Sequence, residues 1–320
     1  MNEATILATL PALPVELIDI KLKLQSLDKS PATTINGELS VYDQVYKTSR
    51  IDFTPGSKIT FENLNHPWVV LYADIINLNG SAEITRTSKI DLKGKNGKNG
   101  ASAPQTTPGL GSAGFSGEPG GQGTDGKSQN IPILYIFTQQ LLWQGIQAKP
   151  QDIQNNLSIS MNGYPGGDGG NGGNGGNGSN GRQGEASRGY RLVCDAGPGW
   201  GGRGGDGGRG GAPGIGGNGT DGGAIYVFTP PIQITSFNAA AYNVKFGQQG
   251  KNGRPGKSGA AGSGGNEGEL NGGCHSAGRR GRDGVSLPVC GLPDISGMPG
   301  VAGPQPSIQA YTGFAELQKI

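Results

Sequence analysis

Residues 163–184 read GYPGGDGGNGGNGGNGSNGRQG, and this stretch decides how the chain folds. Glycine occupies every third position from Gly163 to Gly184, and a second register is also mostly glycine. The third register is polar, with Asp168, Asn171, Asn174, Asn177, Asn180 and Gln183. A helix with three residues per turn puts these registers on two bare faces and one polar face, and its backbone finds hydrogen-bond partners only in neighbouring chains. The stretch therefore predicts a polyglycine II helix packed among similar helices, with its polar register facing water.

Three other interpretations of the glycine content fit less well. The 63 glycines and 21 prolines among 320 residues approach the level of low-complexity disorder, but that signal applies where no period is present. Collagen needs a much higher proline content and a longer run of triplets. A flexible linker does not confine glycine to particular registers. An ordered bundle is the interpretation that we adopt.

The same three-residue period recurs elsewhere in the chain, in segments that we name by their direction. They are the first outward arm (94–100), first return arm (111–126), second outward arm (163–184), second return arm (201–222), third outward arm (247–268) and third return arm (278–303). The second outward, second return and third outward arms have equal lengths, about 65 Å at about 3.1 Å per residue. Equal lengths are typical of a packed bundle of about six helices in antiparallel pairs. A lone arm would be disordered, because ordering a residue costs about 1–2 kcal/mol and a net hydrogen bond returns about 1 kcal/mol.

Runs of β-type residues separate the pairs of arms and resemble one another. They are VVLYADIINLNGSAEITRTSKIDLKG (69–94), ILYIFTQQLLWQG (133–145) with LSISMNG (157–163), and AIYVFTPPIQITSFNAAAYNVKFG (224–247). Tyr72, Tyr135 and Tyr226 align, and RIDFTPG with KITFEN predicts the strands of a preceding copy. Each copy has about the size of one solenoid coil. The predicted fold is mostly β or irregular, with short β-solenoid coils alternating with a bundle of about six polyglycine II helices.

The first 50 residues differ from this repeat. ELIDIKLKLQ (16–25) alternates apolar and polar residues from Ile18 to Leu24, and a period of two predicts a strand. Pro11 and Pro14 suit an extended lead-in. The segment is either an edge strand of the main fold or a docking arm for a partner. The predicted organisation is an N-terminal docking segment (1–50), a β-coil and polyglycine II domain (51–303) and a C-terminal tail (304–320).

Composition and isolated motifs argue against several classes of function. A net charge of +2 gives no strong attraction to nucleic acid, and no apolar run predicts membrane insertion. His66 and His275 are the only histidines, and the GxGxxG matches lack the strand–helix context of a phosphate site, so we expect no metal, no cofactor and no enzymatic activity. The start of the chain carries no Sec-type signal. Of Cys194, Cys274 and Cys290, the last two are one candidate pair in an oxidising compartment, and free thiols are expected for a chain made in the cytosol.

Paired glycine arms joined by tips without the triplet, beside short strands, resemble the glycine-rich tail-fibre tip adhesins of T-even-type phages. The resemblance covers residues 94–303 and implies a receptor-binding protein at the tail-fibre tip of the virion, made in the host cytoplasm. If the protein is not part of a virion, we expect it to be extracellular. It implies that loops joining the arms bind a protein or glycan on the bacterial outer surface. It also implies that the N-terminal segment attaches to the fibre shaft protein. A secreted toxin or surface-structure protein on the same scaffold is the alternative, and an ice-binding protein is a second one.

The tips are the candidate binding sites, because loops on a rigid scaffold usually carry function. They are the first tip (101–110), the second tip (185–200), the third tip (269–277) and a fourth tip (285–296). Tyr, Trp and Arg dominate recognition sites. We therefore expect the receptor to bind the following residues of the tips: Arg188, Tyr190, Arg191, Leu192, Trp200, Gln105 and Leu292. The alternative is that Tyr190, Leu192 and Trp200 pack together and cap the end of the bundle.

Overall fold

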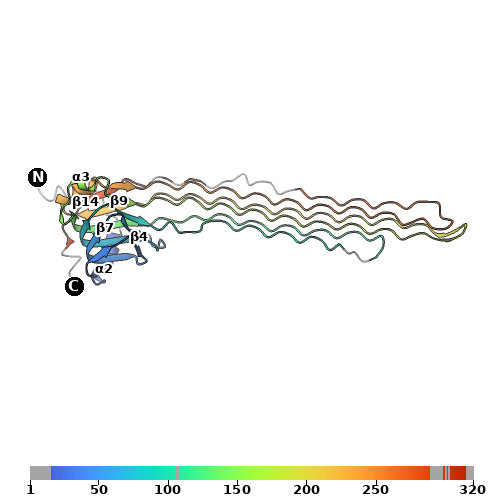
Figure 1. Ribbon diagram of the computed structural model, residues 1–320, viewed down its shortest axis with the longest axis horizontal. Coiled ribbons are helices and arrows are strands. Elements are labelled where there is room, and N and C mark those ends of the chain that lie inside the picture. The colour runs from blue at the N-terminus through green and yellow to red at the C-terminus, as the bar shows by residue number, and fades with distance from the viewer. Residues whose placement is uncertain (1–15, 106–108, 289–297, 300, 302, 315–320) are drawn as a thin grey trace.

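The β-type runs that separate the glycine arms assemble into two parallel sheets at one end of the molecule (Figure 1). This is a computed structural model, and it describes residues 16–105, 109–288, 298, 299, 301 and 303–314. The seven-stranded sheet contains, in spatial order, β1 (Thr33–Ile35), β3 (Val45–Phe53), β5 (Trp68–Leu78), β7 (Ile133–Trp143), β12 (Ile225–Thr229) and β14 (Ser307–Ala310), with β8 (Ile146–Gln147) antiparallel to β7. The five-stranded sheet contains, in order, β13 (Ala241–Asn243), β9 (Leu157–Ser160), β6 (Ala82–Arg86), β4 (Ser57–Phe61) and β2 (Glu38–Val41).

The main core lies between the facing sides of these two sheets. Along β5, Val69, Leu71 and Ala73 point into it from the seven-stranded sheet. Ile59 and Ile84 meet them from the five-stranded sheet. Alternate residues of β5, such as Val70 and Tyr72, belong to a second apolar cluster on the outer side of the seven-stranded sheet. The central strands are therefore apolar on both faces, which explains why their sequences are nearly continuous apolar runs.

Short helices cover parts of this head. They are α2 (Leu17–Gln25), α3 (Pro150–Ile153), a 3₁₀ turn (Pro231–Gln233) and α4 (Ile234–Asn238). The predicted strand at residues 18–24 is wrong, because this segment is α2. Ile20 and Leu24, four residues apart on one helix face, are fully buried against the outer side of the seven-stranded sheet. Ile18 and Leu22 are exposed, so burial follows the helical period and not the alternation.

The predicted fold class is wrong. Among the described residues, the elements are two parallel sheets of seven and five strands with a few short helices, with neither a β-solenoid nor a polyglycine II helix. The reason is that each copy of the repeat adds strands beside the previous copy, so that β3, β5, β7 and β12 pair in sequence. Tyr135 does pair with Tyr226, but Tyr72 lies opposite Phe137, two residues from the predicted alignment. The predicted division at residue 50 falls inside β3.

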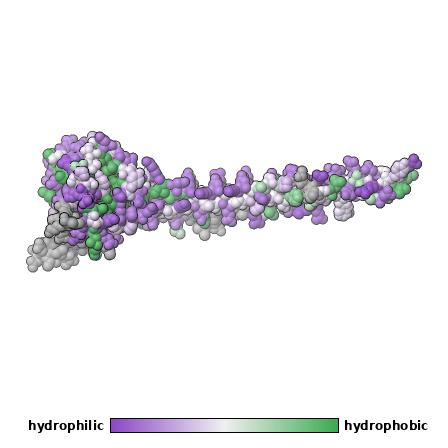
Figure 2. Space-filling model, turned by 90° about the horizontal axis from the view of Figure 1, so that it is seen from below, coloured by the Kyte–Doolittle hydropathy of each residue, from purple (hydrophilic) through white to green (hydrophobic). Residues whose placement is uncertain are grey.

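The glycine arms leave the head as extended chains and run side by side to the far end of the molecule (Figure 1). We call this part the stalk. It is mostly hydrophilic in Figure 2, and the first arm pair, in teal in Figure 1, ends short of the others. The first and last described residues both belong to the head. The stalk therefore carries its tips away from the end at which the described chain enters and leaves.

Backbone hydrogen bonds between arms repeat every three residues. Gly172, Gly175 and Gly178 of the second outward arm donate to Arg254, Lys257 and Ala260 of the parallel third outward arm. The amides of the next register of the second outward arm donate to carbonyl groups of the antiparallel first return arm, as from Gly173 to Gly121. The second return arm donates back to the second outward arm in the same rhythm. The first outward arm also donates to it, as from Gly97 to Asn171, so the second outward arm is bonded to four neighbours. Two glycines per triplet occur along much of this arm and of the second return arm.

The polar register supplies a further ladder, from side chain to backbone. Oδ1 of Asn171 accepts a hydrogen bond from the Arg254 amide at 2.7 Å, and Oδ1 of Asn174 accepts one from Lys257 at 2.8 Å. Asp168 does the same for Lys251 at 2.8 Å. These side chains are exposed, as expected, but their carbonyl groups also join one arm to the next. These side chains therefore hold neighbouring arms together as well as facing the solvent.

The second outward arm is fixed to the head at its base. Tyr164 packs with Leu64 and Leu92, and its hydroxyl donates to the Thr87 carbonyl. The Arg86 guanidinium lies 3.6 Å from the centre of the Tyr164 ring. Burial raises the pKa of Tyr164 and lowers the pKa of Arg86. The first residues of the arm are thus held by a small apolar cluster that is separate from the main core between the sheets.

Candidate functional site: the distal tip of the stalk

A short β-hairpin in the second tip lies at the far end of the stalk (Figure 1). Its strands are β10 (Arg188–Tyr190) and β11 (Val193–Ala196), with Tyr190 paired to Val193. Arg191 and Leu192 form the two-residue turn, and Arg191 has a φ of 52°. A left-handed backbone costs a residue with a side chain about 1–2 kcal/mol, so neighbouring contacts must hold the turn in place. A two-stranded hairpin alone is also marginally stable in water.

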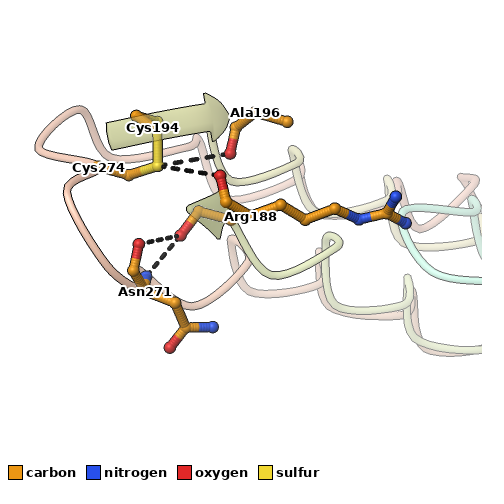
Figure 3. Close-up of a disulfide and its surroundings, with 6 residues drawn as sticks. Arg188, Cys194, Ala196, Asn271 and Cys274 are labelled. Carbon is orange, nitrogen blue, oxygen red and sulfur yellow. Dashed lines mark hydrogen bonds between the residues drawn. A yellow bond between two sulfur atoms is a disulfide. The ribbon is translucent and has the colours of Figure 1, made fainter. Parts of the chain in front are cut away.

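The third tip supplies those contacts (Figure 3). A disulfide joins Cys194 of β11 to Cys274 of the third tip. The Ser187 amide donates to the Glu269 carbonyl at 2.8 Å, and the Ser187 hydroxyl donates to the Asn271 carbonyl at 3.2 Å. The Cys274 sulfur lies 3.6 Å from the Arg188 carbonyl, a contact and not a hydrogen bond because a disulfide sulfur carries no proton. Two loops that are far apart in the sequence are therefore joined into one unit.

This disulfide corrects the prediction for the cysteines. Cys194 pairs with Cys274, and the two are not free thiols. Cys290, the predicted partner of Cys274, lies outside the described residues. The pairing follows from the register of the arms, because the second and third outward arms run in parallel and deliver their tips to the same place.

Apolar and aromatic side chains are exposed around this hairpin. The exposed fraction is 72% for Tyr190, 92% for Leu192 and 63% for Val193, and Arg191 lies 5.3 Å from the Tyr190 ring centre. Trp200, at the end of the second tip, is 66% exposed. Hydrophobic colour accordingly returns at the far end of the stalk in Figure 2. Side chains this exposed do not pack together as a cap, which argues against that alternative.

A pocket of about 300 Å³ lies behind the hairpin, on the side that faces the stalk. Arg188 points toward it, because its side chain runs back along the stalk from β10 (Figure 3). Glu185 and Trp200 also line the pocket, and Leu110 reaches it from the first tip. Arg279 lies 5.5 Å from the Trp200 ring centre. Within the described chain, neither the Arg188 guanidinium nor the Glu185 carboxylate has an ion-pair partner.

The predicted site residues therefore fall into two groups at the tip. Tyr190, Arg191 and Leu192 form the exposed turn, and Arg188 with Trp200 belongs to the pocket. Gln105 is exposed on the first tip but does not line the pocket, and Leu292 lies outside the described residues. Sequence reasoning missed the following residues of the site: Leu110, Glu185, Val193, Cys194, Cys274 and Arg279.

A second, larger pocket lies at the junction of head and stalk. It has a volume of about 890 Å³ and is lined by residues 64–67, 128–131 and 218–222. His66 is its one histidine, and the residues that the structure describes hold no cluster of His, Cys, Asp or Glu suited to a metal ion. In the same described ranges, no helix has the length and apolar character needed to cross a membrane.

Comparison of the chain with protein-family models, with curated proteins and with solved structures gave no match in any of the three.

Proposed function

We propose that the protein is an adhesin that presents the tip of its stalk to a receptor on a bacterial surface. The observation that carries this proposal is the group of exposed residues Tyr190, Arg191, Leu192 and Val193 on a disulfide-linked hairpin at the far end of the stalk. Exposed apolar side chains grouped on a soluble protein mark interaction sites, and Tyr and Arg are frequent hot spots. Such a turn suits insertion into a recess of a partner protein.

The rest of the molecule fits this role. The hydrogen-bonded arms make a stiff spacer, and the disulfide pre-organises the hairpin, which reduces the entropy lost on binding. The head lies at the opposite end, where it is available for attachment to a larger assembly. By the resemblance to tail-fibre tip adhesins, we propose that this assembly is a phage tail fibre and that the N-terminal segment takes part in the attachment.

The test is the binding of fluorescently labelled protein to a panel of bacterial strains and to isolated outer-surface proteins. The double substitution Tyr190→Ser with Leu192→Ser removes the exposed turn side chains. We expect it to weaken binding by about tenfold or more, with little change in the melting temperature, because hot-spot truncations typically cost about 2 kcal/mol or more.

Phe115→Ser is the matched control, because Phe115 is an exposed aromatic residue on the first return arm, away from the hairpin. We expect it to bind as the parent does. Equal binding by the parent and the turn variant would contradict the proposal for the hairpin. Binding to insect or mammalian cells in place of bacteria would support the alternative of a secreted toxin or surface protein.

A further inference from the structure

We infer that the pocket behind the hairpin is a second binding site, for a saccharide that carries a carboxylate group. The inference rests on the proposed role of the tip, but the site is separate from the exposed turn. The turn residues Tyr190 and Leu192 do not line the pocket. Arg188 belongs to the same strand as Tyr190, yet its side chain runs back along the stalk (Figure 3).

The chemistry of the lining identifies the ligand class. Trp200 offers an aromatic surface on which the C–H face of a sugar ring can stack, and its exposed fraction of 66% leaves that surface accessible. Gly197 of the wall has no atom within 4 Å of a Cβ built on it, so its backbone is open to approach by a polar ligand. A volume of about 300 Å³ lies at the lower end of the range for ligand pockets, which suits one or two sugar units.

The two charged groups make the site selective. The Arg188 guanidinium has no ion-pair partner in the described chain, and its planar fork matches the geometry of a carboxylate. Glu185 adds a carboxylate that accepts hydrogen bonds from hydroxyl groups and repels a second negative charge. A ligand with one acidic group and several hydroxyls satisfies both residues. A dianionic phosphate satisfies Arg188 alone and is opposed by Glu185.

The site also combines residues that are far apart in the sequence, which ties it to the intact fold. Leu110 comes from the first tip and Gly111 from the start of the first return arm, and Glu185, Arg188 and Trp200 come from the second tip. The third tip holds the hairpin through Cys274, and Arg279 of the third return arm lies beside the Trp200 ring. An isolated loop peptide therefore lacks the site, and the experiment requires the full chain with its disulfide formed.

The experiment is ligand-observed saturation-transfer NMR on the full chain with sodium glucuronate, sodium N-acetylneuraminate, methyl glucoside and inorganic phosphate. We expect saturation of the ring protons of the two acidic sugars, and affinity weaker by about tenfold or more for methyl glucoside. Competition by phosphate at equal concentration is expected to be weak. Displacement of both sugars by phosphate as effectively as by each other would reassign the site to a simple anion and overturn the inference.

Three variants connect the binding to the pocket. Trp200→Ala is expected to reduce saturation of all sugars, and Arg188→Gln to weaken the acidic sugars by about tenfold while leaving methyl glucoside unchanged. The turn variant Tyr190→Ser with Leu192→Ser is expected to retain full sugar binding. This last variant separates the two proposals: lost cell binding with retained sugar binding supports both. Retained cell binding by the turn variant contradicts only the proposal for the hairpin. The inference for the pocket is overturned if sugar binding survives Trp200→Ala, or if the parent protein binds no sugar.

Discussion

Single glycines determine how closely the arms approach one another. A Cβ atom built on Gly172 would lie 2.0 Å from the Gly211 carbonyl oxygen, a backbone atom that cannot move without moving its arm. A Cβ atom built on Gly197, in the second tip, would have no other atom within 4 Å. Both residues are glycine, but only the first position requires it for packing.

We therefore expect Gly172→Ala to lower the free energy of unfolding by about 2 kcal/mol or more, as overpacked substitutions do. Gly197→Ala is the control and should change the stability by about 0.5 kcal/mol or less. Thermal denaturation followed by circular dichroism measures both. Similar melting temperatures for the two variants would show that the arms are farther apart than the structure has them.

The asparagines of the polar register act through one atom each. Asn171 contributes its Oδ1 to the Arg254 amide, and Asp168 makes the equivalent bond to Lys251 with a carboxylate oxygen. Asn171→Asp keeps the acceptor, whereas Asn171→Leu removes it. We expect the leucine variant to lose about 1 kcal/mol of stability and the aspartate variant to lose little. Equal stability of the two variants in chemical denaturation would mean that the side-chain ladder contributes nothing.

Among the elements, the strands could be predicted from the sequence, but the helix at residues 17–25 could not. β5, β7 and β12 are nearly continuous apolar runs because both of their faces are buried, and such runs favour a parallel strand. The sequence of α2 alternates between apolar and polar residues because Asp19, Lys21 and Lys23 separate the apolar ones. Its buried residues Ile20 and Leu24 nevertheless follow the helical period. Four apolar residues fit both patterns, and only packing against the sheet distinguishes them.

The packing of α2 gives a prediction of its own. Leu24→Ala removes a fully buried side chain from the cluster with Tyr72 and Tyr135, and should cost about 2–5 kcal/mol. Leu22→Ala changes a side chain that is 61% exposed, and should cost about 0.5 kcal/mol or less. Chemical denaturation compares the two. A small effect of both substitutions would identify α2 as an appendage that is not needed for the stability of the head.

The disulfide acts on the tip more than on the whole chain. A disulfide stabilises mainly by restricting the unfolded chain. The Cys194–Cys274 bond lies at the far end of the stalk, so its loss acts first on local opening of the tip while the head is still folded. We expect the double variant Cys194→Ser with Cys274→Ser to retain the melting temperature of the head. Amide exchange in β10 and β11 should become faster, and cell binding weaker. Unchanged exchange in the hairpin would show that the hydrogen bonds of Ser187 suffice to hold it.

For the candidate site, sequence reasoning reached the residues that are neighbours along the chain and missed those that the arms bring together. Tyr190, Arg191 and Leu192 share one turn, so residue type alone was enough to group them. Leu110 and Cys274 lie beside the second tip only because the arms pack side by side in a fixed register. The repeated triplet showed that the arms associate, but their order and relative register depend on all of them at once.

At the scale of the whole molecule, the stalk tolerates changes in length in some places and not in others. Gly207 bonds to Val285 and Gly219 to Met298, so two positions 12 residues apart in the second return arm are matched by positions 13 residues apart in the third return arm. That arm lies at an edge of the stalk. The second outward arm, in contrast, is bonded to four neighbours and has bare glycine on two faces.

The period of the ladder therefore predicts the outcome of insertions after Gly172. One added glycine shifts Gly175, Gly178, Gly181 and Gly184 out of register with the third outward arm, and each lost bond costs about 1 kcal/mol. An added Gly-Asn-Gly triplet keeps glycine in the packed registers, restores the register beyond the insertion and changes only the level at which the second tip lies. We expect the single insertion to melt at a much lower temperature than the triplet insertion, as followed by circular dichroism. The triplet variant should keep its stalk in small-angle scattering but bind cells less well, because its hairpin no longer meets Cys274 at the right level. If the shorter insertion were the better tolerated of the two, the three-residue ladder would not be what holds the stalk together.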